Sequence, residues 1–158
     1  MSTRSMIARR YEDGSFRAVY AHWDGYPEHN GRILLSHYSS VDKLNALLDG
    51  GDISILRETV GDKHNFDDFL QGAESPANKN EWTTFYGRDR GEDGCEASTF
   101  DTLDELITAA KERWSIYVYV FDGEANCPTP QPSWSFTNDG ELQDLAEHLR
   151  QIDLEESA

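Results

Sequence analysis

The sequence predicts a single domain of the α+β class: a mainly antiparallel sheet with an N-terminal hairpin and amphipathic helices packed on it. The length of 158 residues suits one hydrophobic core. The aromatic content of 11% is too high for a disordered chain, and no repeat or Pro/Ser linker divides the sequence. We therefore assign residues 1–158 to one domain, with a partly irregular loop over 61–81 and a frayed tail over 153–158.

A hairpin and a helix are predicted at the start of the chain. Residues 4–11 and 15–23 are rich in strand-forming residues and flank a short acidic turn, where Gly14 can take a positive φ. Residues 32–38 then carry apolar side chains at helical spacing, and Asn30 is suited to cap them.

A second helix and two short strands are predicted next. Ser40 is suited to cap a helix over 41–49, which the glycine pair at 50–51 would end. Residues 83–87 predict a strand, and residues 96–100 predict a strand that returns beside it after an acidic turn.

A capped helix and the strongest strand follow. Asp101 or Thr102 should cap a helix over 103–114, and Glu105 would complete a capping box with Thr102. Residues 116–121 alternate between aliphatic and aromatic side chains, so both faces of this strand should be covered. A strand over 133–137 should pair with it through two aromatic residues.

The last predicted element is an acidic amphipathic helix over 139–152. Its apolar stripe consists of Leu142, Leu145, Ala146, Leu149 and Ile152. Three acids lie outside this stripe or at its edge, at helical positions i, i+3 and i+6: Glu141, Asp144 and Glu147. Each step rises about 4 to 5 Å, which is of the same order as the phosphate spacing along a DNA strand. Such an array can imitate a nucleic-acid backbone.

The charge of the chain limits the classes of molecule that it is expected to bind. There are 30 Asp and Glu against 14 Lys and Arg, a net charge of -16, and all of the excess acid lies after residue 40. This field repels phosphate backbones and anionic membranes, so we expect no direct binding to nucleic acid or membrane. It favours a basic protein surface as the partner. The alternative without a binding role is that the acids keep a small domain soluble.

The segment "HWDGYPEH", residues 22–29, concentrates reactive side chains. His22, Asp24 and His29 could share a metal or a proton, which defines the alternative hypothesis of a small metal-dependent or acid/base enzyme. A metal site usually needs three or more protein ligands in one shell, and the sequence does not establish that these residues meet.

The favoured interpretation of the same segment is structural. Asp24 and Gly25 make a turn, Pro27 stiffens it, and Trp23 and Tyr26 pack over the core. A third hypothesis is that the protein has a structural or regulatory role. Its partner would then dock on an exposed aromatic turn formed by Trp23, Tyr26 and Pro27.

No motif for catalysis or a cofactor is present. The sequence lacks GxSxG, HExxH, GxxxxGK[ST] and GxGxxG, so we expect no cofactor and no metal. Cys95 and Cys127 belong to no CxxC pair and indicate reduced thiols. Without a signal peptide or a long apolar run, the predicted location is the cytoplasm. The oligomeric state stays open.

The first third of the chain resembles a known family signature. The matching segments are "STRSMI" (2–7), "DG" (13–14), "VYAHWDGYPEHNGRILLSHY" (19–38) and "LLDGGDIS" (47–54). They resemble the N-terminal signature of short proteins from phages, prophages and mobile elements. The resemblance assigns no activity to particular residues. It implies an accessory gene, of a class in which small acidic proteins often inhibit host defence or host nucleic-acid enzymes.

These observations favour a non-enzymatic accessory protein that binds a basic protein surface in the cytoplasm of a host cell. In its specific form, the hypothesis is a DNA-mimicking inhibitor of a host nuclease of the restriction or CRISPR type. The carboxylates predicted to carry the binding are Glu141, Asp144, Glu147, Asp153, Glu155 and Glu156.

Overall fold

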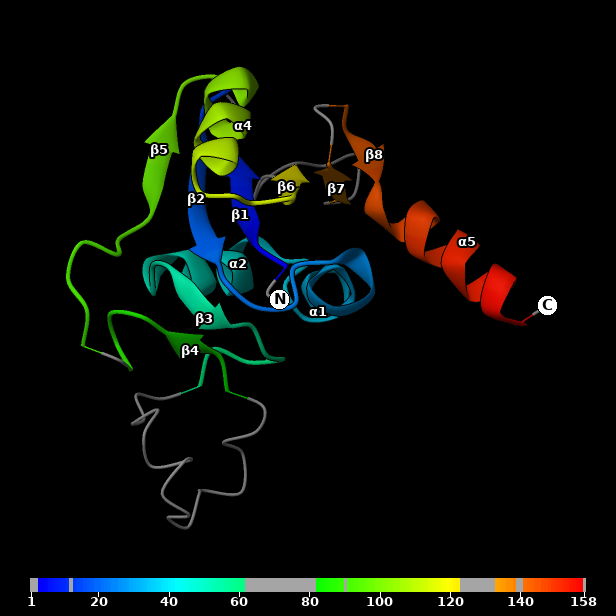
Figure 1. Cartoon of the computed structure of the whole chain (residues 1–158), viewed down its shortest axis with the longest axis horizontal. Coiled ribbons are helices and arrows are strands. Elements are labelled where there is room, and N and C mark those ends of the chain that lie inside the picture. The colour runs from blue at the N-terminus through cyan, green and yellow to red at the C-terminus, as the bar shows by residue number, and fades with distance from the viewer. Residues whose placement is uncertain are drawn as a thin grey trace, which may run out of the picture.

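The computed structural model describes residues 3–11, 13–61, 82–89, 91–122, 133–138 and 141–157. These residues form an eight-stranded, mostly antiparallel sheet with helices on both faces, which confirms the predicted single α+β domain (Figure 1). The strands are β1 (Ser5–Arg10), β2 (Phe16–Ala21), β3 (Ile53–Ile55), β4 (Thr84–Phe85), β5 (Ser98–Phe100), β6 (Tyr117–Asp122), β7 (Ser133–Thr137) and β8 (Gln143–Asp144). The helices are η1 (Pro27–Gly31), a π-helical turn, α1 (Arg32–His37), α2 (Val41–Asp49), α4 (Leu103–Glu112) and α5 (Leu145–Ser157).

Strand β1 lies at the centre of the sheet, whose order is β4-β3-β2-β1-β6-β7-β8. It pairs antiparallel with β2, as the predicted hairpin requires, and parallel with β6. Ser5 therefore lies between Ala21 and Tyr117 in one row of the sheet. The segments beside this row are joined by hydrogen bonds at the start of β1, from Gly25 to Thr3 and from Ile116 to Arg4.

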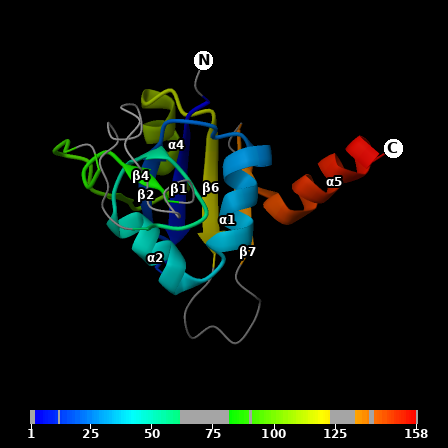
Figure 2. The ribbon, with the colours of Figure 1, turned by 90° about the horizontal axis from the view of Figure 1, so that it is seen from below.

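The alternation predicted for β6 is confirmed. Val118 and Val120 face the cluster that contains α4, and Tyr119 and Phe121 face the cluster that contains α1, α2 and α5. The two aromatic residues of β7 pack beside them, since Phe136 pairs with Tyr119 in the register of the two strands. Figure 2 shows α1 and α2 lying over one face of the strands. The sheet is thus buried on both faces. This agrees with β6, which has apolar side chains on both of its faces.

Two helices begin at the predicted caps. The Ser40 hydroxyl accepts a hydrogen bond from the Lys43 amide, and the Thr102 hydroxyl accepts one from the Glu105 amide. The second half of the predicted capping box differs by one position, because the Glu105 carboxylate accepts the amide of Asp101 instead of that of Thr102. Both helices still have polar partners for their free N-terminal amides.

Three predictions at the level of secondary structure are wrong. Asn30 does not cap α1, because the π-helical turn η1 leads directly into that helix. Strand β5 pairs with β2 and does not return beside β4. The helix predicted over 139–152 begins only at Leu145, and it runs on to Ser157, through the stretch predicted to fray.

The start of α5 is displaced because residues 143–144 form β8, which pairs with β7. The predicted apolar stripe is correspondingly shorter. Leu145 and Leu149 are buried on the side of α1, whereas Leu142 packs against the α4 side of the sheet and Ala146 is exposed. The loop predicted over 61–81 lies, from residue 62 on, outside the described residues.

Candidate functional site

The turn after β2 is fixed against the start of β1. The amide of Gly25 donates to the carbonyl of Thr3 at 2.7 Å. A Cβ at Gly25 would lie 2.8 Å from both that oxygen and the Cβ of Ser5, so this position accepts only glycine. The Tyr119 hydroxyl donates to the carbonyl of Gly25, and burial raises the pKa of Tyr119 further above neutral pH.

Asn30 closes the same turn from the other side. Its side-chain amide donates to the carbonyl of Trp23 at 3.2 Å, and its backbone amide donates to the carbonyl of Asp24. Asn30 is fully buried, so these bonds satisfy polar groups that water cannot reach. The sequence drew attention to Asn30 as a cap, and its actual role is to hold this loop.

The three residues of the enzyme hypothesis do not form a metal site. Nδ1 of His22 lies 2.7 Å from the hydroxyl of Tyr20, and Nε2 of His29 lies 4.0 Å from a carboxylate oxygen of Asp24. Across the described part of the chain, no three His, Cys, Asp or Glu side chains come together in a group that could hold a metal ion. Burial also raises the pKa of the free thiol of Cys95, which makes it a poor nucleophile.

Trp23 and Tyr26 do not pack over the core. Both are exposed, whereas Pro27 is buried. The structural interpretation of this turn is therefore confirmed for its backbone and wrong for its aromatic side chains. The surface required by the docking hypothesis exists, without Pro27.

The predicted carboxylate array on the last helix does not exist. Glu141 and Asp144 precede α5, so Glu141, Asp144 and Glu147 do not lie at i, i+3 and i+6 of one helix. Asp144 instead caps α5, because its carboxylate accepts the amide of Glu147 at 2.9 Å. Asp144, one of the predicted binding residues, therefore stabilises the start of α5.

Two further acids of this region have internal partners. Hydrogen bonds from Gln151 and Arg150 lower the pKa of Glu147. The carboxylate of Asp153 accepts two hydrogen bonds from Arg32 on α1, the shorter at 2.6 Å, and these lower the pKa of Asp153. Of the remaining predicted residues, Glu141 and Glu155 are exposed, and the side chain of Glu156 lies outside the described structure.

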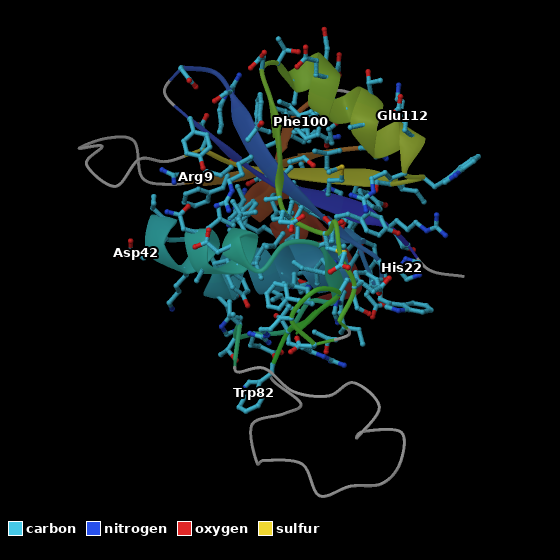
Figure 3. All side chains as sticks on the ribbon, turned by 90° about the vertical axis from the view of Figure 1, so that its left-hand side faces the viewer. Arg9, His22, Asp42, Trp82, Phe100 and Glu112 are labelled. Atoms are coloured by element: carbon cyan, nitrogen blue, oxygen red, sulfur yellow. The ribbon has the colours of Figure 1, made fainter. Side chains whose placement is uncertain are left out.

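A different acidic surface lies on α4. An open groove of about 450 Å³ runs along this helix beside β5, and its lining residues are Phe100, Asp104, Glu105, Thr108, Ala109 and Glu112. Figure 3 shows Phe100 beside α4 and Glu112 at the far end of the helix. Asp104 and Glu112 are exposed and make no ion pair with any described residue. We call this surface the α4 groove.

Sequence reasoning missed the α4 groove, although a signal was present. The pattern over 103–114 predicts a capped amphipathic helix, and its acids recur on the face opposite Leu106 and Ala110, the two residues buried on α4. The apolar floor could not be foreseen, because Phe100 reaches it only through the pairing of β5 with β2.

Several arginines form ion pairs away from the α4 groove. Six arginines of the described ranges pair with acids: Arg10 with Asp122, Arg17 with Asp49, Arg32 with Asp153, Arg88 with Asp89, Arg113 with Asp52 and Arg150 with Glu147. Lys111 is the base that α4 itself carries, against three acids in that helix. The α4 groove therefore keeps a local excess of negative charge.

A search of the helices for membrane spans and three comparisons with known proteins complete the description. None of the helices in the described ranges combines the length and the apolar character needed to cross a bilayer. Searches against protein-family models, curated proteins and solved structures found no match for this chain.

Proposed function

We propose that this protein is a non-enzymatic acidic binding protein, which attaches to a basic protein surface through the α4 groove. The observation that carries the proposal is the pair of exposed carboxylates, Asp104 and Glu112, that form no ion pair with any residue in the described ranges and border an apolar floor. Acids whose only role was solubility would not need a floor of Phe100 and Ala109 between them.

The groove suits lysine and arginine side chains. Their aliphatic stems can lie on Phe100 and Ala109, while their charged ends bind the carboxylates at the rim. Asp104 and Glu112 are eight residues apart, or about 12 Å along the helix axis. The acids of α4 thus extend over the length of about three or four phosphates of one DNA strand.

The basic surface that we propose belongs to a nucleic-acid-binding enzyme of the host. A surface built to grip phosphates presents Lys and Arg at this spacing, and a net charge of -16 speeds its encounter with the protein. The resemblance of the first third to phage and mobile-element proteins supports a host nuclease of the restriction or CRISPR type as the partner. Action in the host cytoplasm is part of the same proposal.

The test is capture of the partner from a bacterial lysate by the tagged chain and by the double variant Asp104→Asn/Glu112→Gln. We expect the wild-type chain to retain a nucleic-acid enzyme at about 0.1 M salt and to release it toward about 1 M, because salt screens exposed charges. The variant should retain much less. The captured enzyme should then lose activity on DNA when the wild-type chain is added.

The matched control is Glu147→Gln/Asp153→Asn, which removes the same charge from acids that are already paired within the fold. It should capture the enzyme almost as well as the wild type. Binding that persists at about 1 M salt, or that both double variants weaken equally, would contradict the assignment to the α4 groove.

A further inference from the structure

The outer edge of strand β5 borders the α4 groove. Strand β5 pairs antiparallel with β2 on one side, where Phe100 lies opposite Phe16. On its other side, no strand of the described ranges pairs with it, and no described backbone hydrogen bond outside the strands and helices involves residues 98–100. Ser98 and Thr99 are also exposed. Within the described structure, the amides and carbonyls of β5 that face away from β2 therefore lack a backbone partner, and we call them the β5 edge.

Every second side chain of β5 faces the α4 groove. Phe100 lines the groove, and Ser98, two residues earlier, faces the same side of the sheet. Their partners in β2, Phe16 and Ala18, belong to the cluster packed against α4. Figure 1 shows β5 outside β2 in the sheet, and Figure 3 shows Phe100 beside α4. A strand added to the β5 edge would thus place alternate side chains next to the groove.

The described surface around the β5 edge is acidic. Glu96 and Asp101 flank the strand, and both are exposed. Asp104 and Glu112, which line the α4 groove, are exposed as well. A segment that adds to this edge therefore meets carboxylates at both ends of β5 and along α4.

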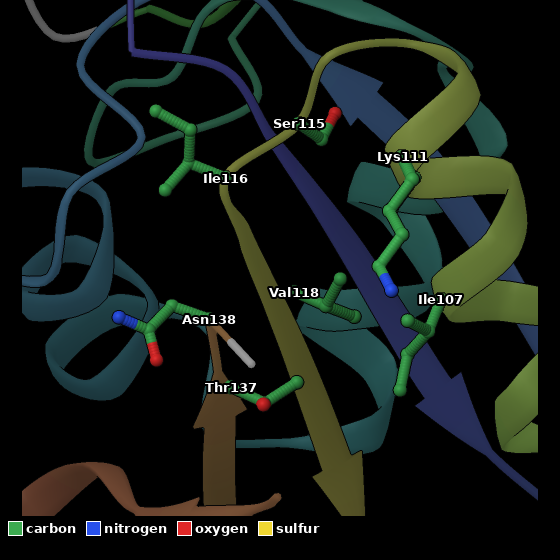
Figure 4. A pocket seen from close by; sticks show the side chains of 8 residues that line it. Ile107, Lys111, Ser115, Ile116, Val118, Thr137 and Asn138 are labelled. Carbon is green, nitrogen blue, oxygen red and sulfur yellow. The ribbon is translucent and has the colours of Figure 1, made fainter. Parts of the chain in front are cut away.

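The bases on the neighbouring elements leave this excess of acid in place. Three arginines are paired with acids: Arg10 with Asp122, Arg17 with Asp49 and Arg113 with Asp52. Lys111 lies on the other side of α4, where it borders a recess of about 30 Å³ between α4 and β6. Figure 4 shows Lys111 and Val118 at the border of this recess, and no described base lines the α4 groove. Charge complementarity therefore favours a cationic segment at the β5 edge.

We infer that the α4 groove takes its basic partner as an extended strand, which adds to the β5 edge. The backbone of the partner pairs with residues 98–100, and lysine or arginine at every second position lies in the groove. Positions i and i+4 of a strand are about 13 Å apart, close to the spacing of about 12 Å between Asp104 and Glu112 along α4. The inference rests on the proposed function and deepens it, because it specifies the conformation and the residue pattern of the bound segment.

Other occupants suit the edge less well. Pairing of the β5 edges of two copies would bring together two sets of the same acids, in a chain of net charge -16. A helical partner would leave the backbone groups of the edge unsatisfied, because a helix bonds its own amides and carbonyls internally. A cationic strand satisfies both the backbone edge and the carboxylates.

The first test compares two short peptides that contain the same numbers of lysine and threonine residues and have both ends blocked. In one peptide lysine and threonine alternate, and in the other all lysines precede the threonines. We expect the full chain to bind the alternating peptide severalfold more tightly at about 0.1 M salt, because only this peptide presents all its charges on one face of a strand. Asp104→Asn/Glu112→Gln should remove the preference, and the control Glu147→Gln/Asp153→Asn should keep it.

The second test separates backbone pairing from charge. N-methyl groups are placed on all lysine amides or on all threonine amides of the alternating peptide, which leaves its charge unchanged. Amides of alternate residues point to opposite edges of a strand, so only one of the two sets faces β5. One methylated peptide should therefore bind about tenfold or more weakly, and the other should keep most of its affinity.

Amide hydrogen exchange locates the bound peptide on the chain. In the free chain, the amides of residues 98–100 that face away from β2 should exchange fast, and those that pair with β2 should exchange more slowly. Addition of the alternating peptide should slow the first set. The block peptide should slow it much less.

The possible failures distinguish the inference from the proposed function. Equal binding of the alternating and block peptides, lost in Asp104→Asn/Glu112→Gln, would refute strand addition and leave the groove as a cation site. An equal effect of both methylation patterns would also refute it. Slow exchange of both amide sets in the free chain would show that the edge is already covered, by this chain or by a second copy. Binding of neither peptide would overturn the inference, while the capture experiment would still decide the proposed function.

Discussion

The helices α4 and α5 are both acidic and amphipathic, yet they use their acids differently. On α5, Glu147 and Asp153 are held by arginines, and Asp144 caps the helix. On α4, Asp104 and Glu112 face solvent beside an open groove. The difference shows that the number of carboxylates on a surface does not tell how many are available to a partner.

The largest expected effect concerns what the two helices share. Leu106 on α4 and Leu145 on α5 are both fully buried, on opposite faces of the sheet. Replacement of either by alanine should lower the free energy of unfolding by about 2 to 5 kcal/mol, because each leaves a cavity. Denaturant unfolding measures this. Leu154→Ala, at an exposed site, should change it by less than about 0.5 kcal/mol. A small loss for only one of the two buried leucines would mean that its helix is not part of the core.

A smaller effect separates the acids that serve the fold from those that do not. Asp144→Ala should cost about 0.5 to 2 kcal/mol, since α5 loses the acceptor for one of its first amides. Asp144→Asn should retain most of the stability, because the amide oxygen still caps the helix. Thermal melts of the two variants check this. Equal losses would show that charge and not capping is what Asp144 contributes.

The dependence on pH should differ between α5 and α4. The pKa values of Glu147 and Asp153 are lowered in the folded chain, so the unfolded chain binds protons first as the pH falls. Their stabilisation is present above the ordinary carboxylate range near pH 4 and is lost below it. The melting temperature of Glu147→Gln/Asp153→Asn should therefore lie below that of the wild type at pH 7 and approach it near pH 3. A gap that does not shrink would contradict the pairing.

The smallest expected effect has the opposite sign. Asp104→Asn/Glu112→Gln removes two charges that pair with no described residue from a chain of net charge -16, which relieves repulsion. Glu112 lies in the last turn of α4, where a carboxylate is disfavoured, and Asp104 lies in the first turn, where a carboxylate is favoured, so these two helix-dipole effects oppose each other. The melting temperature should stay constant or rise slightly at low salt, and the gain should disappear at about 1 M salt. A clear loss of stability would reveal internal partners for these acids.

Local signals in the sequence predicted much of the fold. The hairpin, the caps at Ser40 and Thr102 and the two-faced strand β6 depend on neighbouring residues, and all were predicted. The start of α5 was not, because residues 143–144 become a strand only through their pairing with β7. The placement of β5 likewise depends on β2, far away in the sequence.

The candidate sites were harder to predict for the same reason. Asp153 and Glu155 have the same appearance in the sequence, but only the packing of α1 beside α5 places Arg32 against Asp153. Trp23 and Tyr26 precede a π-helical turn, η1, which no residue pattern in the sequence predicted, and both side chains are exposed. The first third of the chain thus indicated an important turn without showing which of its side chains face solvent.

The central position of β1 has a consequence for how the chain folds. Its parallel neighbour, β6, is synthesised only after most of the chain, because Ser5 pairs with Tyr117, more than a hundred residues later in the sequence. Closing so long a loop is entropically costly, and contacts this distant in sequence slow folding. During synthesis, one edge of the β1–β2 hairpin stays unpaired until β6 emerges, and an unpaired apolar edge invites aggregation or chaperone binding. Fast growth at high temperature should therefore reduce the yield of this protein through its slow assembly, even where the finished domain is stable.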